Sequence, residues 1–149
     1  MKRIALYAAV MALLVAGCGG GDSLSKAALV KQANAICVKY SDQAKALGDA
    51  NLKDPAVAEA YFRKAGDLAK AQLDELKALK PGDDEKAEFD KLTSAYSDAV
   101  TLLGDLADAA GKQDRDAGTR LITELTPISE TVDEAARGIG AASCASTAG

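Results

Sequence analysis

The chain has 149 residues, 27% of them charged, with 18 basic against 22 acidic side chains. This length fits one domain, and the acidic balance argues against nucleic-acid binding and against electrostatic adhesion to anionic lipid headgroups. The chain has no His, and its two Met residues stand at positions 1 and 11, so a processed domain lacks the usual haem ligands and the usual general base.

The first eighteen residues differ in composition from the rest of the chain. A basic start precedes an apolar run over residues 4–15, which is shorter than the ~20 residues that span a bilayer. The run leads into Val15, Ala16, Gly17 and Cys18. These four residues resemble the lipobox, in which the thiol of Cys18 receives acyl groups such as palmitate and the peptide before it (residues 1–17) is removed. The alternative is an ordinary secretory signal that leaves Cys18 as a free thiol.

Residues 18–24 then form a tether. Three glycines, Asp22 and Ser23 follow Cys18, and this composition is typical of a flexible linker. Loss of the signal removes Lys2 and Arg3, which leaves a net charge of −6 on the mature chain. We therefore expect the lipid, rather than charge, to hold the protein at the membrane, since each buried methylene contributes ~0.8 kcal/mol.

Residues 25–149 are predicted to form a helical domain, because apolar residues recur there every three or four positions. The predicted helices cover about residues 25–47, 54–79, 84–110 and 115–138. Ser25 is a good N-cap for the first, and Gly48 ends it. Asp54 and Pro55 open the second, because the first helical position needs no N–H group.

The last two helices carry acidic starts and one interruption. Asp83, Asp84 and Glu85 lie where the dipole of the third helix is positive. In the fourth, Pro127 removes the hydrogen bond to the carbonyl of Thr123 and predicts a kink. No segment alternates with a period of two, so the sequence predicts an all-α, antiparallel (up-down-up-down) four-helix bundle with a modest, alanine-rich core.

Two cysteines remain once Cys18 carries a lipid. Cys37 and Cys144 are expected to pair in an oxidising compartment, and chain-entropy arguments give roughly 4–5 kcal/mol for closure of so long a loop. No Cys-x-x-Cys motif is present, which favours a structural over a redox-active disulfide. The pairing needs either an overhanging first helix or a tail after Gly138 that turns back, and the glycines there favour the second geometry.

Several other side chains are candidates for a site. Tyr40, Tyr61 and Tyr96 lie on the apolar faces of three predicted helices, where they either ring a small pocket or act as core residues with the hydroxyl at the rim. Core packing is the commoner role for such tyrosines. Pro127 either opens a cavity between the third and fourth helices or bends the fourth around the bundle.

Charged clusters have a similar ambiguity. The acidic residues near position 85, which include Glu88, are candidates for Ca²⁺ binding, but they fit a helix N-terminus better because they lack the alternating ligands and Gly turn of an EF-hand. Arg115, Arg120 and Arg137 are candidates for an anionic ligand. Acidic neighbours surround each of them, which favours a solvated, salt-bridged face.

Residues 33–37 read Ala-Asn-Ala-Ile-Cys. They resemble the Ala-Asn-x-Ile-Cys signature of small uncharacterised actinobacterial lipoproteins. Many of these end in an Ala-rich helix, Leu-Gly and a last Cys, and residues 136–140 with Cys144 are similar, with Ile139 in the Leu place. The resemblance implies a disulfide-tied helical domain on the outer face of the cell membrane and no known reaction.

We therefore expect a membrane-anchored, extracytoplasmic lipoprotein without enzymatic activity, metal or cofactor. It would bind or scaffold an envelope protein, a wall component or a small ligand. The alternatives are a substrate-capturing or chaperone-like lipoprotein with an apolar groove, and an envelope hydrolase that uses carboxylates alone. Two close, buried carboxylates in a deep pocket would favour the hydrolase.

Replacement of the acceptor thiol tests the anchor. The substitution Cys18→Ser removes the atom that receives the lipid, so we expect the protein to stall as an uncleaved precursor or to appear in the medium. Immunoblots of membrane and medium fractions measure this. Normal cleavage with full membrane retention in the variant would contradict lipidation at Cys18.

Overall fold

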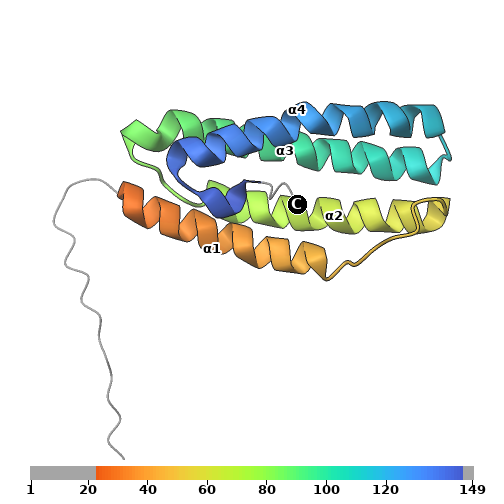
Figure 1. Ribbon diagram of the computed structural model, residues 1–149, viewed down its shortest axis with the longest axis horizontal. Coiled ribbons are helices and arrows are strands. Elements are labelled where there is room, and N and C mark those ends of the chain that lie inside the picture. The colour runs from red at the N-terminus through yellow and green to blue at the C-terminus, as the bar shows by residue number, and fades with distance from the viewer. Residues whose placement is uncertain (1–22, 146–149) are drawn as a thin grey trace, which may run out of the picture.

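The computed structural model describes residues 23–145, so the predicted export signal, Cys18 and most of the predicted tether lie outside the described residues. Within this range the chain forms four α-helices and a final 3₁₀ turn, without any strand (Figure 1). The elements are α1 (Lys26–Lys45), α2 (Pro55–Lys77), α3 (Asp83–Gly111), α4 (Arg115–Ile139) and η1 (Ala142–Cys144). The all-helical, four-helix prediction is confirmed, and the chain turns back at each helix connection (Figure 1).

The helices begin within one residue of their predicted starts, whereas α1 and α2 end two residues before their predicted ends. The Ser25 hydroxyl accepts a hydrogen bond from the Ala28 N–H group, and the Asp54 carboxylate accepts from two N–H groups in the first turn of α2. Asp114 caps α4 in the same way, with Asp114 Oδ1 2.9 Å from the nitrogen of Ala117. Each cap satisfies backbone donors that a helix start leaves without partners.

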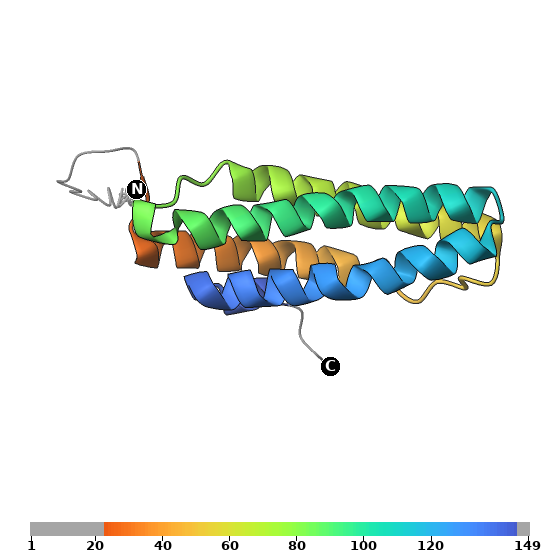
Figure 2. The ribbon, with the colours of Figure 1, turned by 90° about the horizontal axis from the view of Figure 1, so that it is seen from above.

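The four helices do not pack equally against one another. The central helix is α3, which packs along both α2 and α4, whereas α1 packs mainly against α2 and η1. Because α1 has 20 residues and α3 has 29, their lengths are about 30 Å and about 44 Å. Residues 46–54 run as an irregular connection from the end of α1 to the start of α2 (Figure 2). The half of the bundle that holds α1 and η1 is called the near half, and the half beyond the end of α1 the far half.

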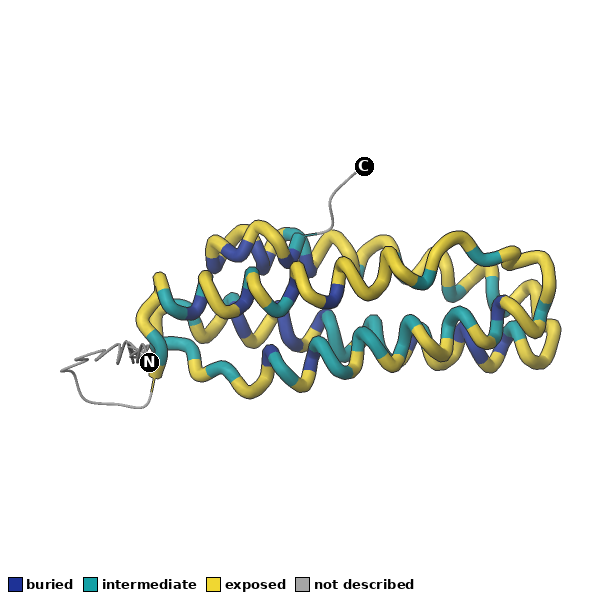
Figure 3. The backbone as a smooth tube through the Cα atoms, turned by 90° about the horizontal axis from the view of Figure 1, so that it is seen from below, coloured by how far each residue is buried: buried dark blue, intermediate teal, exposed yellow. Residues whose placement is uncertain are grey.

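The buried core is concentrated in the near half, where the darkest segments of Figure 3 gather. Leu29, Leu76, Leu92 and Ile139 are fully buried there. The rest of this core is largely alanine, which lets the helices approach closely while each residue buries little apolar area. In the far half Leu106 is the largest fully buried side chain.

A left-handed glycine redirects the chain at the end of α4. Gly140 has a φ of 86°, a conformation that side chains disfavour, and the Ala141 N–H group donates to the Ala136 carbonyl at 2.8 Å. The tail then lies against α1, where the Ser143 N–H group donates to Asn34 Oδ1 at 2.8 Å. The tail therefore turns back along α1, as the glycines suggested.

This turn brings Cys144 beside Cys37 in the middle of α1. The two cysteines form a disulfide across a sequence separation of 107 residues, with their Cα atoms 5.0 Å apart. Both residues are buried and belong to the near-half core. The pairing predicted from the sequence is confirmed, and it ties the C-terminal end of the described chain to the middle of α1.

Helix α4 is continuous through Pro127, and its axis changes direction near the middle of the helix (Figure 2). The proline lacks the N–H group that would reach the Thr123 carbonyl, which accounts for a bend at this place. Gly138 lies inside α4 rather than ending it, since the helix continues to Ile139. A Cβ atom at Gly138 would lie 3.2 Å from Glu88 Cγ of α3, so the glycine permits the close approach of these helices.

Removal of the disulfide should destabilise the near half selectively. We expect the double variant Cys37→Ala/Cys144→Ala to lose about 2–5 kcal/mol of unfolding free energy, because the long loop is no longer closed. Hydrogen exchange should rise most in α1 and η1, since α1 has little packing besides α2 and η1. Urea titration and amide exchange measure the two effects. An equal rise in α3 would contradict the selective role.

Candidate functional site

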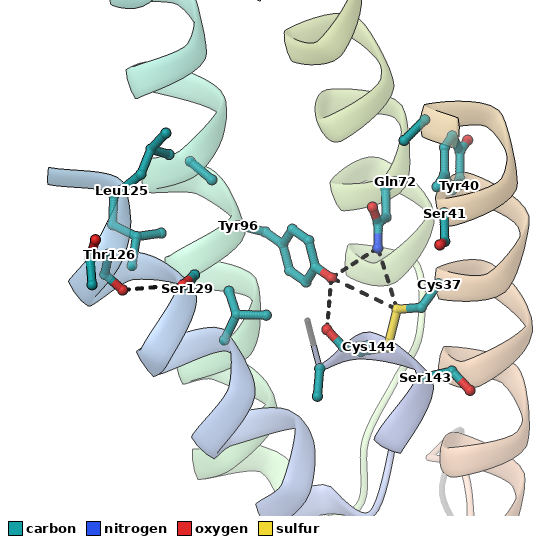
Figure 4. A pocket seen from close by; sticks show the side chains of 15 residues that line it. Cys37, Tyr40, Ser41, Gln72, Tyr96, Leu125, Thr126, Ser129, Ser143 and Cys144 are labelled. Atoms are coloured by element: carbon teal, nitrogen blue, oxygen red, sulfur yellow. Dashed lines mark hydrogen bonds between the residues drawn. A yellow bond between two sulfur atoms is a disulfide. The ribbon is translucent and has the colours of Figure 1, made fainter. Parts of the chain in front are cut away.

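An open cleft of about 590 Å³ lies beside the disulfide, between α1 and α4 (Figure 4). Its floor comes from α2 and α3, and its near end is closed by η1 with Cys144. None of the residues that line it is Asp, Glu, Lys or Arg, although 27% of the chain is charged. We call it the disulfide cleft, and its volume is typical of small-molecule sites.

A polar network crosses the floor of the disulfide cleft (Figure 4). The Gln72 amide donates to Tyr96 Oη at 3.0 Å, and the Tyr96 hydroxyl donates to the Cys144 carbonyl at 3.3 Å. Gln72 Nε2 also lies 3.3 Å from Cys37 Sγ. The network ties α2 and α3 to the turned-back tail, so the position of η1 rests on hydrogen bonds as well as on the disulfide.

The surroundings of Tyr96 keep its hydroxyl protonated. Burial raises the pKa of Tyr96, and the negative charge of Asp133 raises it further, while the hydrogen bond from Gln72 opposes the shift. A phenol with a raised pKa is a hydrogen-bonding group at neutral pH rather than a base. Tyr96 therefore fits a structural or ligand-positioning role.

A second tyrosine stands at the rim of the cleft. The Tyr40 hydroxyl donates to Glu75 Oε1 at 2.7 Å, and Lys39 Nζ pairs with the same oxygen. These hydrogen bonds lower the pKa of Glu75, chiefly through Lys39, and the bond to Glu75 raises the pKa of Tyr40. The positive charge of Lys39 therefore balances the negative charge of the Glu75 carboxylate at the edge of the cleft.

The wall from α4 combines apolar and hydroxyl side chains. Leu125, Ile128 and Val132 face the cleft, together with Thr126 and Ser129. The Ser129 hydroxyl donates to the Thr126 carbonyl at 3.2 Å. Across the cleft, the side-chain hydroxyls of Ser41 and Ser143 have no protein partner within residues 23–145. The cleft therefore has hydroxyl groups without a protein partner on the side of α1 and η1 and an apolar wall on α4.

The structure separates the four residues proposed for a pocket. Tyr40 and Tyr96 both line the disulfide cleft, whereas Tyr61 does not; its ring lies edge-on to that of Phe62, with centroids 5.7 Å apart. Pro127 lines a different, smaller hollow of about 300 Å³ between α3 and α4. Two of the four candidates thus share one site.

The acidic candidates lie elsewhere. Asp83, Asp84 and Glu85 occupy the first turn of α3, as expected for a helix start, and Glu88 pairs with Lys91. Within residues 23–145, no group of three or more His, Cys, Asp or Glu side chains is placed to hold a metal ion.

The arginines are dispersed over α4 rather than gathered at one site. Arg137 pairs with Asp133 at 3.1 Å one turn earlier. Arg115 lines the far-half cleft described next, and Arg120 is an exposed residue of α4. The structure therefore brings no arginine cluster to the disulfide cleft.

A second cleft, of about 820 Å³, lies in the far half and is called the far cleft. It lies between the start of α2, the end of α3 and the start of α4, beside the irregular connection that follows α1. Leu52 and Ile122 line it with 50% and 54% of their surfaces exposed, and Val57 on the first turn of α2 is 40% exposed. Lys53, Asp114 and Arg115 stand at its loop end.

Some of these residues carry no clear signal in the sequence. Gln72 occupies a core-facing position of α2, four residues from both Leu68 and Leu76, and this polar break in an apolar stripe is the one local sign of its role. Ile122 stands beside Leu121 and is not part of the predicted apolar stripe. That it lines the far cleft together with residues of α2 and α3 is shown only by the packed chain.

The fold and its clefts define a class of protein: a disulfide-closed helical bundle with an open, uncharged cleft. No helix among residues 23–145 combines the length and apolar character required to cross a bilayer. Comparison of the chain with protein-family models, with curated proteins and with solved structures gives no match in any of the three. Function is therefore inferred from the clefts themselves.

Loss of the Tyr96 hydroxyl tests the polar network. We expect Tyr96→Phe to lower the unfolding free energy by about 1–2 kcal/mol, because the Cys144 carbonyl loses its donor. Tyr61→Phe is the matched control, since the Tyr61 hydroxyl has no hydrogen-bond partner within the described chain.

The pH dependence of the same variants gives a second readout. The raised pKa of Tyr96 contributes stability that is present below about pH 10 and is lost as the pH rises through the folded-state pKa. Urea titrations at neutral and alkaline pH measure this loss, which should shrink in Tyr96→Phe. Equal alkaline losses in the wild type and in both variants would contradict the role of Tyr96.

Proposed function

We propose that this chain is an extracytoplasmic lipoprotein, anchored through acylated Cys18, whose antiparallel four-helix bundle binds a small ligand in the disulfide cleft. The basic start, short apolar run and lipobox-like residues before Cys18 support the anchor. The disulfide supports an oxidising compartment, because such bonds persist outside the cytoplasm. The observation that carries the binding role is an open cleft without a charged lining residue in a highly charged chain.

The chemistry of the cleft favours binding over catalysis. Its ionisable lining groups are two tyrosines with raised pKa values, and its cysteines are joined to each other. General acid–base catalysis near neutral pH needs a group that titrates there, and raised tyrosine pKa values move away from that range. We therefore rank the carboxylate-based hydrolase last.

Capture of an apolar substrate is a second candidate function, because of exposed apolar side chains in the far half. Leu52, Val57 and Ile122 are three of the four large apolar residues that are most exposed among residues 23–145. Such clustering is typical of a surface that receives an apolar partner. A scaffold with closed, polar faces fits this arrangement less well.

Native mass spectrometry of the full chain, purified from membranes in nanodiscs, tests ligand binding. We expect a non-covalent mass increment of one small molecule per chain, which disappears when the protein is unfolded. The substitution Thr126→Trp fills the cleft from the α4 wall and should abolish the increment, because the indole takes the volume that the ligand needs.

Thr123→Trp is the matched control for that experiment. Thr123 is an exposed threonine one turn earlier on α4, and it lines neither the disulfide cleft nor the far cleft. The control should keep the increment at its wild-type level. Binding would be refuted by wild-type protein that carries no increment, or by an increment that both tryptophan variants retain.

A further inference from the structure

We propose that the two clefts together hold one single-chain lipid with an uncharged, hydroxyl-bearing head, such as a monoacylglycerol. This proposal rests on the proposed binding function and names the ligand class. The acyl chain would lie toward the far cleft, and the head would lie among the hydroxyls of the disulfide cleft.

The two clefts follow one another along α4. Thr126 and Ser129 line the disulfide cleft, whereas Gly118 and Ile122 line the far cleft. Ile122 and Thr126 are four residues apart and therefore neighbours on one face of the helix. α1 does not cover this face of α4 in the far half, because α1 ends at Lys45.

The lack of charged residues in the lining of the disulfide cleft favours a ligand with an uncharged head. Charged residues are absent from the lining of the disulfide cleft, and those of the far cleft stand at its loop end. An anionic headgroup in the disulfide cleft would lose hydration without gaining a cation, which is costly. A head with hydroxyl groups instead finds partners in Ser41 and Ser143, whose hydroxyls have no protein partner among the described residues.

The apolar part has the dimensions of one acyl chain. From Arg115, at the loop end of the far cleft, to Leu125, on the apolar wall of the disulfide cleft, the helix rises by about 15 Å. One leaflet of a bilayer core, half of ~30 Å, accommodates one acyl chain over about 15 Å. Ile122 and Leu52 are half exposed in the far cleft and would become covered by such a chain. One acyl chain therefore fits this length.

Photolabelling tests the proposal on membranes from cells that express the full chain. The probe is a monoacylglycerol with a diazirine in its acyl chain, and the readout is its attachment to the tryptic fragment of residues 121–137, which carries Ile122 and Ser129. We expect labelling to saturate and to be displaced by unlabelled monoacylglycerol, but not by an anionic lysophosphatidylglycerol of the same chain length.

Two exposed apolar residues provide a matched pair of variants. Ile122→Glu places a carboxylate in the far cleft and should reduce labelling roughly tenfold, because the chain loses apolar contacts and meets a charge. Val38→Glu makes the same change at a residue of α1 that is 47% exposed and lines neither cleft. It should leave labelling unchanged, and because both sites are exposed both variants should fold.

Four results would overturn the proposal. The first is equal displacement by the anionic lipid, and the second is labelling that survives Ile122→Glu. The third is labelling that is seen only when Cys18→Ser removes the protein's own acyl chains. The fourth is a cross-link from this fragment to a second protein chain in place of lipid. If one of them occurs while native mass spectrometry still shows a ligand that Thr126→Trp removes, binding in the disulfide cleft stands and the lipid assignment alone fails.

Discussion

The disulfide between Cys37 and Cys144 is the constraint on which the rest of the structure depends. It fixes the turned-back tail against the middle of α1, and η1 then occupies the place where α1 and α4 would otherwise face each other. A closed bundle of four equal helices would leave no room for a cleft there. Here the tail closes the near half and leaves the remaining space between α1 and α4 open (Figure 4).

The division into two halves has an energetic basis. Alanine-rich packing buries little area per residue, so the near half combines a tight core with a covalent link and the hydrogen bonds of Tyr96 and Gln72. The far half lacks α1, and several of its apolar side chains remain half exposed. Stability is concentrated where the tail meets α1, and apolar surface is left exposed in the far half.

The same arrangement accounts for the electrostatics of the clefts. The acidic and basic side chains pair on outer faces, as in Lys70–Asp74 of α2 and Lys86–Asp90 of α3, which leaves the space between α1 and α4 uncharged. At the rim, Glu75 is neutralised by Lys39 and bound by Tyr40. The uncharged lining of the disulfide cleft is the property that led us to propose a neutral, amphipathic ligand.

The sequence by itself determined the helices and their ends, because caps, prolines and apolar periodicity act over a few residues. It also indicated the disulfide partners, since Cys37 and Cys144 are the two thiols that remain if Cys18 carries the predicted lipid. It identified Tyr40 and Tyr96 as candidates, yet it could not separate them from Tyr61, which has the same periodic position on its own helix.

Only the tertiary structure decided which residues share a site. The far cleft lies where α1 has already ended, since α1 is about nine residues shorter than α3 and the connection after it is irregular. Gln72 became part of a network because the tail returns past α2. These are contacts between segments far apart in the chain, and local periodicity carries no information about the length of a neighbouring helix or the path of a returning tail.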